Sequence, residues 1–119
     1  ILVAGGAGFI GFHLSKRLVQ AGYDVVCLDN LRTGTRENVD DLSRHHPVEF
    51  LEHDVAEPLR WRTPLRAVFN LARPASPRHY QADPLHTMMT SVNGTRHLLE
   101  LAERHGATFV QASTSEVYG

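Results

Sequence analysis

The chain has 119 residues, of which 42% are hydrophobic, and its formal net charge at pH 7 is -1. This length suits one domain with a modest core, and the apolar fraction excludes an intrinsically disordered chain. The near-zero charge gives no electrostatic case for a nucleic-acid or anionic-membrane partner. No apolar run approaches the roughly 18 residues of a membrane-spanning helix, and we expect no signal peptide and a reducing, cytoplasmic location.

Strand and helix patterns alternate in the first half of the chain. Residues 1–5 (ILVAG) predict a short buried strand, and the helical spacing after the following glycine cluster predicts a helix that Gly22 ends. The residues predicted to share one face of that helix are Phe9, Ile10, His13, Leu14, Arg17, Leu18 and Ala21. Residues 23–30 predict a second strand, 31–46 a loop with a short helix, and 48–54 a third strand.

The second half continues the alternation. Residues 57–65 predict an irregular segment, 66–72 a buried strand, and 73–84 a loop, because that last segment contains three prolines. A long helix is predicted from Leu85 to His105, capped by Gly106, and residues 107–113 predict the last strand. The predicted apolar face of the long helix consists of Leu85, Met88, Met89, Val92, Leu98, Leu99 and Ala102. This order predicts an α/β fold, a Rossmann-like doubly wound parallel sheet covered on both faces.

The glycine cluster AGGAGFIG contains the pattern G-x-x-G-x-x-G at Gly5, Gly8 and Gly11. Glycine permits the sharp turn from strand to helix, lets the backbone approach a pyrophosphate, and lets the helix pack closely on the strand. Free N–H groups at the start of the helix would then face the phosphates. The cluster therefore predicts a dinucleotide site.

Asp29 ends the second strand, near the spacing of about 20 residues expected of a carboxylate that binds the ribose hydroxyls. A carboxylate there repels a 2′-phosphate, which favours NAD over NADP, although Arg32 and Arg36 follow nearby. We assign residues 1–119 to the N-terminal portion of an NAD(P)-binding Rossmann domain. Both ends of the chain look cut, so we expect the remainder of that domain and a substrate domain to lie outside it.

Metal binding is not expected, because the eight histidines lack the spacing of metal ligands. The single cysteine, Cys27, lies in an apolar run and is predicted to be a buried, inert thiol.

Six segments together resemble the extended short-chain dehydrogenase/reductases that act on nucleotide sugars, the NAD-dependent epimerase/dehydratase family. They are GGAGFIGFHL, LDNLRTG, HDV, NLARPASP, QADPLHTMMTSVNGT and ASTSEVYG. Within that family, PASP followed by a tyrosine and DP, and then ASTSEVYG, is most similar to the UDP-glucuronate decarboxylases, also called UDP-xylose synthases. The resemblance covers the whole chain but only the first part of such an enzyme.

The resemblance implies a cofactor site for NAD. It places Gly5, Gly8, Phe9 and Ile10, beside Gly11 of the motif, at the pyrophosphate. The adenosine ribose and its phosphate would contact Asp29, Asn30, Leu31, Thr33 and Gly34, and the adenine would contact Asp54 and Val55. The nicotinamide half would lie along Leu71, Ala72 and Thr90. It also implies that Pro74, Ala75, Ser76 and Tyr80 belong to the substrate side.

The implied catalytic residues are Thr114, which would hydrogen-bond the sugar 4-hydroxyl or the catalytic tyrosine, and Ser115 and Glu116 beside the sugar ring. The family's Tyr-x-x-x-Lys pair is expected further along the gene. Tyr118 is not that tyrosine, since no lysine follows it at the required spacing, and it is predicted to be a packed aromatic residue.

Two residues depart from the family pattern. Asn70 stands where the family usually has histidine, and Arg73 stands where a small residue is usual. An arginine at position 73 could bind a carboxylate or phosphate of the substrate, or it could point to solvent.

The implied reaction is the decarboxylation of UDP-glucuronate to UDP-xylose through a 4-keto intermediate. We expect the longer enzyme to catalyse it and residues 1–119 alone to be inactive. The alternatives are a nucleotide-sugar 4-epimerase, a 4,6-dehydratase, which the TSE sequence in place of an acid pair disfavours, and a non-catalytic NAD-binding module. The resemblance also implies a homodimer that pairs through the long helix, although packing on its own sheet explains the apolar stripe of that helix equally well.

Overall fold

The computed structural model describes residues 1–73 and 77–118. These residues form a five-stranded parallel sheet of order β3-β2-β1-β4-β5. The strands are β1 (Leu2–Ala4), β2 (Val25–Asp29), β3 (Val48–Glu52), β4 (Ala67–Asn70) and β5 (Thr108–Gln111). The predicted α/β, Rossmann-like fold is confirmed.

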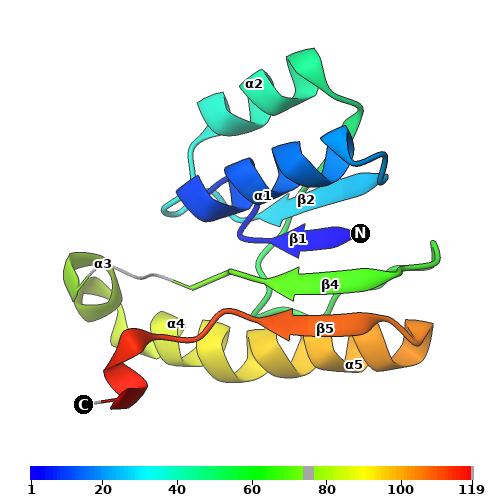
Figure 1. The fold of residues 1–119 in the computed structure, drawn as a ribbon. Helices are drawn as coiled ribbons and strands as arrows, with labels where there is room; N and C mark the ends of the chain where they lie inside the picture. The colour runs from blue at the N-terminus through cyan, green and yellow to red at the C-terminus, as the bar shows by residue number, and fades with distance from the viewer. Residues whose placement is uncertain (74–76, 119) are drawn as a thin grey trace.

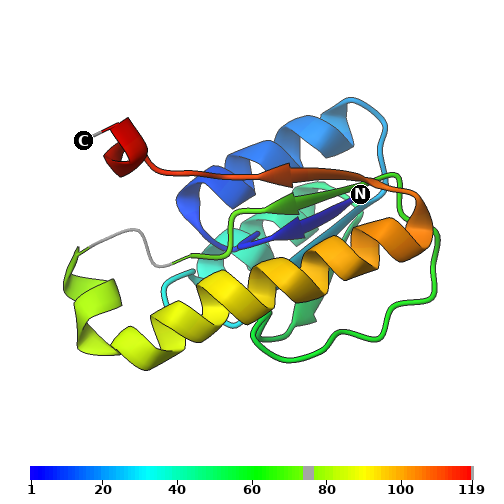
Figure 2. The ribbon, with the colours of Figure 1, turned by 90° about the horizontal axis from the view of Figure 1, so that it is seen from below.

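Helices cover both faces of the sheet (Figure 1). Helices α1 (Phe9–Gln20) and α2 (Arg36–His45) lie on one face, and α5 (Thr95–His105) lies on the other. The connection between β3 and β4, residues 53–66, has no helix and runs along the same face as α5 (Figure 2). This route carries the chain from one edge strand past β2 and β1 to β4, so the strand order reverses beside β1.

The alternation of side chains along the strands divides the core into two clusters. The cluster on the α5 face consists of Leu2, Ala4, Leu28, Val55, Leu65, Val68, Leu98, Leu101 and Ala102. The cluster on the α1 face contains Val3, Val25, Cys27 and Leu42. Cys27 is 1% exposed and its thiol donates to Ser15 Oγ (3.1 Å), so its predicted burial is confirmed. Burial raises the pKa of the Cys27 thiol, and this outweighs the hydrogen bond to Ser15, which lowers it.

The face predicted for α1 is wrong in part: Leu14 and Leu18 pack against the cluster on this side of the sheet, but the other predicted members do not. The helix buries Gly11 and Ser15, whereas Phe9 and Ile10 are 78% and 66% exposed. His13, Arg17 and Ala21 are exposed as well. The physical reason is that α1 approaches the sheet most closely at small residues, and a prediction from the spacing of hydrophobic residues does not include glycine and serine.

The loop predicted for residues 73–84 is also wrong in part, because helix α3 (Pro77–Ala82) lies within it. Proline is tolerated in the first turn of a helix, where its missing N–H would have no intrahelical partner. The next helix, α4 (Pro84–Met89), follows the same rule: Pro84 is its first residue, and Asp83 caps it by accepting from His86 N–H (3.0 Å).

The long helix predicted from Leu85 is present, but it is interrupted by a π-helical turn, η1 (Thr90–Gly94), between α4 and α5. Its apolar residues do not form one buried face. Leu98 and Ala102 are buried together with Leu101, whereas Leu85, Met88, Met89, Val92 and Leu99 are exposed. The wide turn changes the helical register between the two halves, so a single spacing of 3.6 residues cannot describe both.

Candidate functional site

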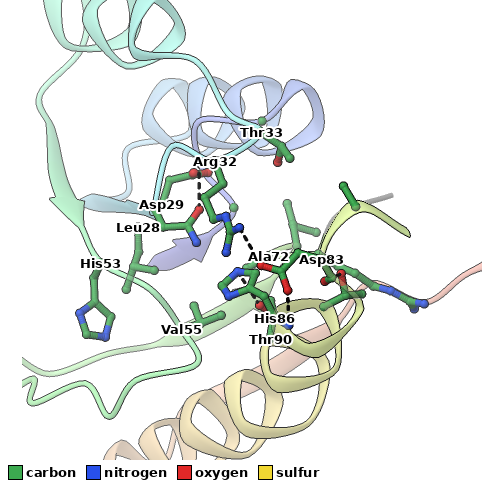
Figure 3. A pocket seen from close by; sticks show the side chains of 17 residues that line it. Leu28, Asp29, Arg32, Thr33, His53, Val55, Ala72, Asp83, His86 and Thr90 are labelled. Carbon is green, nitrogen blue, oxygen red and sulfur yellow. Dashed lines mark hydrogen bonds and ion pairs between the residues drawn. The ribbon is translucent and has the colours of Figure 1, made fainter. Parts of the chain in front are cut away.

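A cavity of about 240 Å³ lies where the carboxyl ends of β1, β2 and β4 meet (Figure 3). Ligands of open α/β sheets bind at this place, outside the strand ends and at the point where the strand order reverses. The cavity brings together predicted cofactor residues from five separate segments: Gly5 and Gly8; Asp29, Asn30 and Thr33; Val55; Leu71 and Ala72; and Thr90. The remaining predicted cofactor residues, Phe9, Ile10, Gly11, Leu31, Gly34 and Asp54, lie in or next to these segments without lining the cavity.

Two glycines set the shape of the loop that follows β1. Gly5 has a φ of +79°, and a Cβ there would lie 2.7 Å from the carbonyl carbon and oxygen of Leu71, at the end of β4. A Cβ on Gly11 would collide with the carbonyl oxygen of Gly5 and lie 2.7 Å from Gly6 Cα. The loop therefore fits tightly against β4, and α1 fits tightly against the loop.

The N-terminus of α1 is left open beside the cavity. Gly8 is its N-cap residue, no side chain caps it, and its first turn has no acidic residue. The backbone N–H groups at this end and the positive end of the helix dipole are therefore available to an anion. Together with the glycine clearance, this arrangement fits the pyrophosphate of a dinucleotide.

Asp29 joins the glycine loop to the loop that follows β2. Its side chain is largely buried; Oδ2 accepts from Ala7 N–H (3.0 Å) and Oδ1 accepts from Leu31 N–H (2.8 Å). Leu31 has a left-handed backbone, with φ of 57°, in the turn that follows β2. Each oxygen of Asp29 keeps a second acceptor position, so the carboxylate can also accept from two ribose hydroxyls.

Asp54 lies between the β2 and β3 ends. Its Oδ2 accepts from Asn30 Nδ2 (2.9 Å), its Oδ1 accepts from Ala56 N–H (2.9 Å), and His86 Nε2 lies 3.6 Å from Oδ2. Burial raises the pKa of Asp54, but the hydrogen bonds from Ala56 and Asn30 and the charges of His86 and Arg32 outweigh it, so the pKa lies below its ordinary value. Asp54 is therefore a carboxylate at neutral pH.

Several lining residues were not predicted, and they come mainly from α3 and α4. They are Leu28, His53, Ala82, Asp83, His86 and Thr87. The order Asp-Pro at the start of a helical pattern is typical of an N-cap followed by a first-turn proline, and it could have identified Asp83. Because residues 73–84 are predicted to be a loop, Asp83 is not identified from the sequence as a helix N-cap.

Asn70 supports the loop at the end of β4. It is 3% exposed, its Nδ2 donates to Gln111 Oε1 (2.9 Å) and Thr95 Oγ1 (3.3 Å), and its Oδ1 accepts from Ala72 N–H (3.2 Å). Asn70 therefore fixes the backbone of Ala72, which lines the cavity. Arg73 follows it, lines the cavity and is exposed.

The predicted substrate and catalytic residues are only partly placed. Pro74, Ala75 and Ser76 lie outside the described residues, and Tyr80 lies in α3 without lining the cavity. Thr114 is partly buried beyond β5, and Ser115 and Glu116 begin the short 3-10 helix η2 (Ser115–Tyr118).

The prediction that Tyr118 is packed is wrong, since it is 89% exposed. Helix η2 projects beyond the end of β5 (Figure 1), so the described part of the chain offers Tyr118 no surface to pack against.

Within residues 1–73 and 77–118, no helix combines the length and the apolar character needed to cross a bilayer.

Known proteins match the whole of this chain. It matches the NAD dependent epimerase/dehydratase family over residues 1–119. It is 44% identical to UDP-glucuronic acid decarboxylase 1 of Danio rerio, over 100% of this chain and 28% of that protein. The chain thus spans little more than a quarter of that relative.

Solved structures of related enzymes share the fold. A UDP-galactose 4-epimerase superimposes with a TM-score of 0.84 at 37% identity, covering 99% of this chain and 39% of that one. DesIV, a dTDP-glucose 4,6-dehydratase from Streptomyces venezuelae solved with NAD bound, superimposes with a TM-score of 0.83 at 31% identity, covering 99% of this chain and 40% of that one.

Proposed function

The chain belongs to the NAD-dependent epimerase/dehydratase family, and from this we propose that its cavity binds NAD as part of a nucleotide-sugar enzyme. The observation that carries the proposal is the pairing of an uncapped α1 N-terminus with a buried Asp29 carboxylate at one end of the sheet. The first fits a pyrophosphate and the second fits a ribose with a free 2′-hydroxyl. Asp54, Val55 and Thr90 would then lie along the adenine and nicotinamide parts.

We further propose that the enzyme decarboxylates UDP-glucuronate to UDP-xylose through a 4-keto intermediate. The identity of 44% to a UDP-glucuronic acid decarboxylase, against 37% to a UDP-galactose 4-epimerase, favours this reaction over epimerisation. NAD supplies a reversible hydride acceptor for C4 of the sugar when it is bound. A ketone at C4 allows the C5 carboxylate to leave as CO₂, because the electrons of the broken C5–C6 bond collect on the ketone oxygen as an enolate, and a proton then takes the place of the carboxylate at C5.

The chain's own residues would orient these two ligands. The N–H groups at the start of α1 hold phosphate, the carboxylate of Asp29 fixes the ribose, and the backbone of Ala72, held by Asn70, borders the nicotinamide side. Thr114, Ser115 and Glu116 would meet the sugar, with Thr114 at the 4-hydroxyl. The only lysine of the sequence is Lys16, in α1, so a Tyr-x-x-x-Lys proton-transfer pair would have to come from outside these 119 residues. We therefore propose that residues 1–119 alone do not turn over substrate.

Product analysis tests the reaction. The full-length gene product is incubated with NAD⁺ and, separately, with UDP-glucuronate, UDP-glucose and dTDP-glucose, and products are identified by liquid chromatography and mass spectrometry. We expect UDP-xylose and CO₂ from UDP-glucuronate and no conversion of the two glucose nucleotides. Formation of UDP-galactose or of a 4-keto-6-deoxy sugar would establish a 4-epimerase or a 4,6-dehydratase instead. NAD⁺ binding without conversion of any of the three would support a non-catalytic module.

We also propose that the enzyme is a homodimer that pairs through the exposed apolar residues of α4, η1 and α5. Leu85, Val92 and Leu99, one from each of these three elements, are 66%, 62% and 50% exposed. A second copy would remove this apolar surface from water. Light scattering on the full-length gene product is expected to give the mass of a dimer, and Val92→Glu is expected to give a monomer; a monomeric wild-type protein would contradict the proposal.

A further inference from the structure

Two arginines follow Asp29 closely enough to bear on the choice between NAD and NADP. The two cofactors differ by a phosphate on the adenosine 2′-oxygen, and a guanidinium is the side chain best suited to bind it. Arg32 lines the same cavity as Asp29, whereas Arg36, the first residue of α2, does not. A free Arg32 would therefore weaken the preference for NAD that Asp29 imposes.

Arg32 is not free. Its Nη2 donates to Oδ2 of Asp83 (3.0 Å), a residue 51 positions away at the start of α4 (Figure 3). The guanidinium therefore points away from the β2 end and across the cavity toward the helix. Arg32 N–H also donates to Asn30 Oδ1 (3.1 Å), which helps to fix the backbone from which the side chain departs.

A second hydrogen bond holds the Asp83 carboxylate in the position from which it contacts Arg32. Its second oxygen, Oδ1, accepts from His86 N–H (3.0 Å) at the first turn of α4, so the carboxylate has a fixed position. The hydrogen bonds from His86 N–H and from Arg32 lower the pKa of Asp83, which keeps it charged at neutral pH. The side chains of Arg32 and Asp83 are 48% and 43% exposed, so the pair is weak enough to separate when the carboxylate loses its charge.

We propose that Asp83 is a positioning residue for cofactor specificity: it holds the Arg32 guanidinium away from the adenosine 2′ position, so that selection of NAD depends on Asp83 as well as on Asp29. The inference rests on the proposed NAD site and adds a second determinant to it. It predicts that removing the charge of Asp83 releases Arg32 toward a 2′-phosphate.

Asp83→Asn is the direct test, because asparagine caps a helix as well as aspartate does and only the charge is lost. Affinities for NAD⁺ and NADP⁺ are measured by calorimetry on the full-length gene product after bound nucleotide has been removed. We expect the NADP⁺ dissociation constant to fall about three- to tenfold, in line with the modest strength of exposed charge pairs. The NAD⁺ dissociation constant should stay within about twofold, since the Asp29 contacts are unchanged. A merely structural role of Asp83 would instead weaken both cofactors together.

Three further variants isolate the cause. Asp83→Glu keeps the charge and is expected to retain the wild-type preference. Arg32→Ala combined with Asp83→Asn is expected to lose the gain in NADP⁺ affinity. Glu52→Gln is the matched charge control, because it changes the net charge equally and releases a different arginine, Arg36. Glu52 contacts Arg36 at 3.6 Å, and Arg36 also packs over the Phe50 ring, outside the cavity. It is expected to leave NADP⁺ affinity unchanged.

An NADP⁺ affinity that does not rise in Asp83→Asn, or that rises equally in Glu52→Gln or without Arg32, would overturn the inference. If Asp83→Asn does not fold, Asp83→Ser gives the same test, because serine also caps. A wild-type protein that binds neither nucleotide would refute the proposed function itself. A wild-type protein that binds NAD⁺ while Asp83→Asn behaves identically would refute only the role of Asp83.

Discussion

Gly11→Ala is expected to lower the free energy of unfolding by about 3 kcal/mol and to abolish detectable NAD⁺ binding. The added methyl carbon would overlap the carbonyl oxygen of Gly5 and approach Gly6 Cα to 2.7 Å. Both contacts are with backbone, which cannot rotate away as a side chain can. The glycine loop and the start of α1 must therefore separate, and this displaces the N–H groups proposed to hold the pyrophosphate. Urea-induced unfolding and a calorimetric NAD⁺ titration of the full-length gene product measure the two effects.

Gly22→Ala provides the contrasting control. Gly22 has a φ of +87°, but a Cβ there meets nothing within 4 Å. We expect a cost of about 1 kcal/mol from backbone strain alone, with NAD⁺ affinity unchanged. If Gly11→Ala bound NAD⁺ like the wild type, close packing of α1 on the loop would not be what shapes the phosphate site.

Asp29→Ala is expected to weaken NAD⁺ binding by about 100-fold and to destabilise the fold by about 2 kcal/mol. The substitution removes both acceptors of the ribose hydroxyls. It also leaves the N–H groups of Ala7 and Leu31 without the carboxylate that they contact at 3.0 and 2.8 Å. The two loops that border the cavity would then lose their direct connection.

Asp29→Asn separates these two roles. Its side-chain oxygen can still accept from one backbone N–H, but its NH₂ group faces the other donor, so we expect an intermediate loss of NAD⁺ affinity and a smaller preference over NADP⁺. Asp40→Ala, which removes an equal charge from the exposed side of α2, is the control and should leave binding unchanged. Wild-type affinity in Asp29→Ala would show that the nucleotide binds elsewhere.

The strands were predictable because their signal is strong. The cores of β1 and β2 are short apolar runs whose residues are all buried, and such runs are typical of parallel strands covered on both faces. Asp29 and the glycines were predictable for a related reason: a cofactor site at strand ends requires particular residue types at a nearly fixed spacing.

The missed features depend on tertiary packing. The fully buried part of the α1 face was missed because it consists of Gly11 and Ser15, and the sequence does not show which small residues lie against a strand. The pairing of Arg32 with Asp83 was missed because it joins segments 51 residues apart, and no local spacing encodes it. Helix α3 was missed because the prolines of residues 73–84 favour a loop, whereas Pro77 occupies the first position of the helix, where proline is tolerated.

A crystal structure of the full-length gene product with NAD⁺ bound would be decisive for the site described above. We predict that the diphosphate oxygens lie within hydrogen-bonding distance of the amides that open α1, and that the adenosine hydroxyls contact the Asp29 carboxylate. Electron density for the nucleotide in any other place, or an adenosine ribose that does not contact Asp29, would contradict the account.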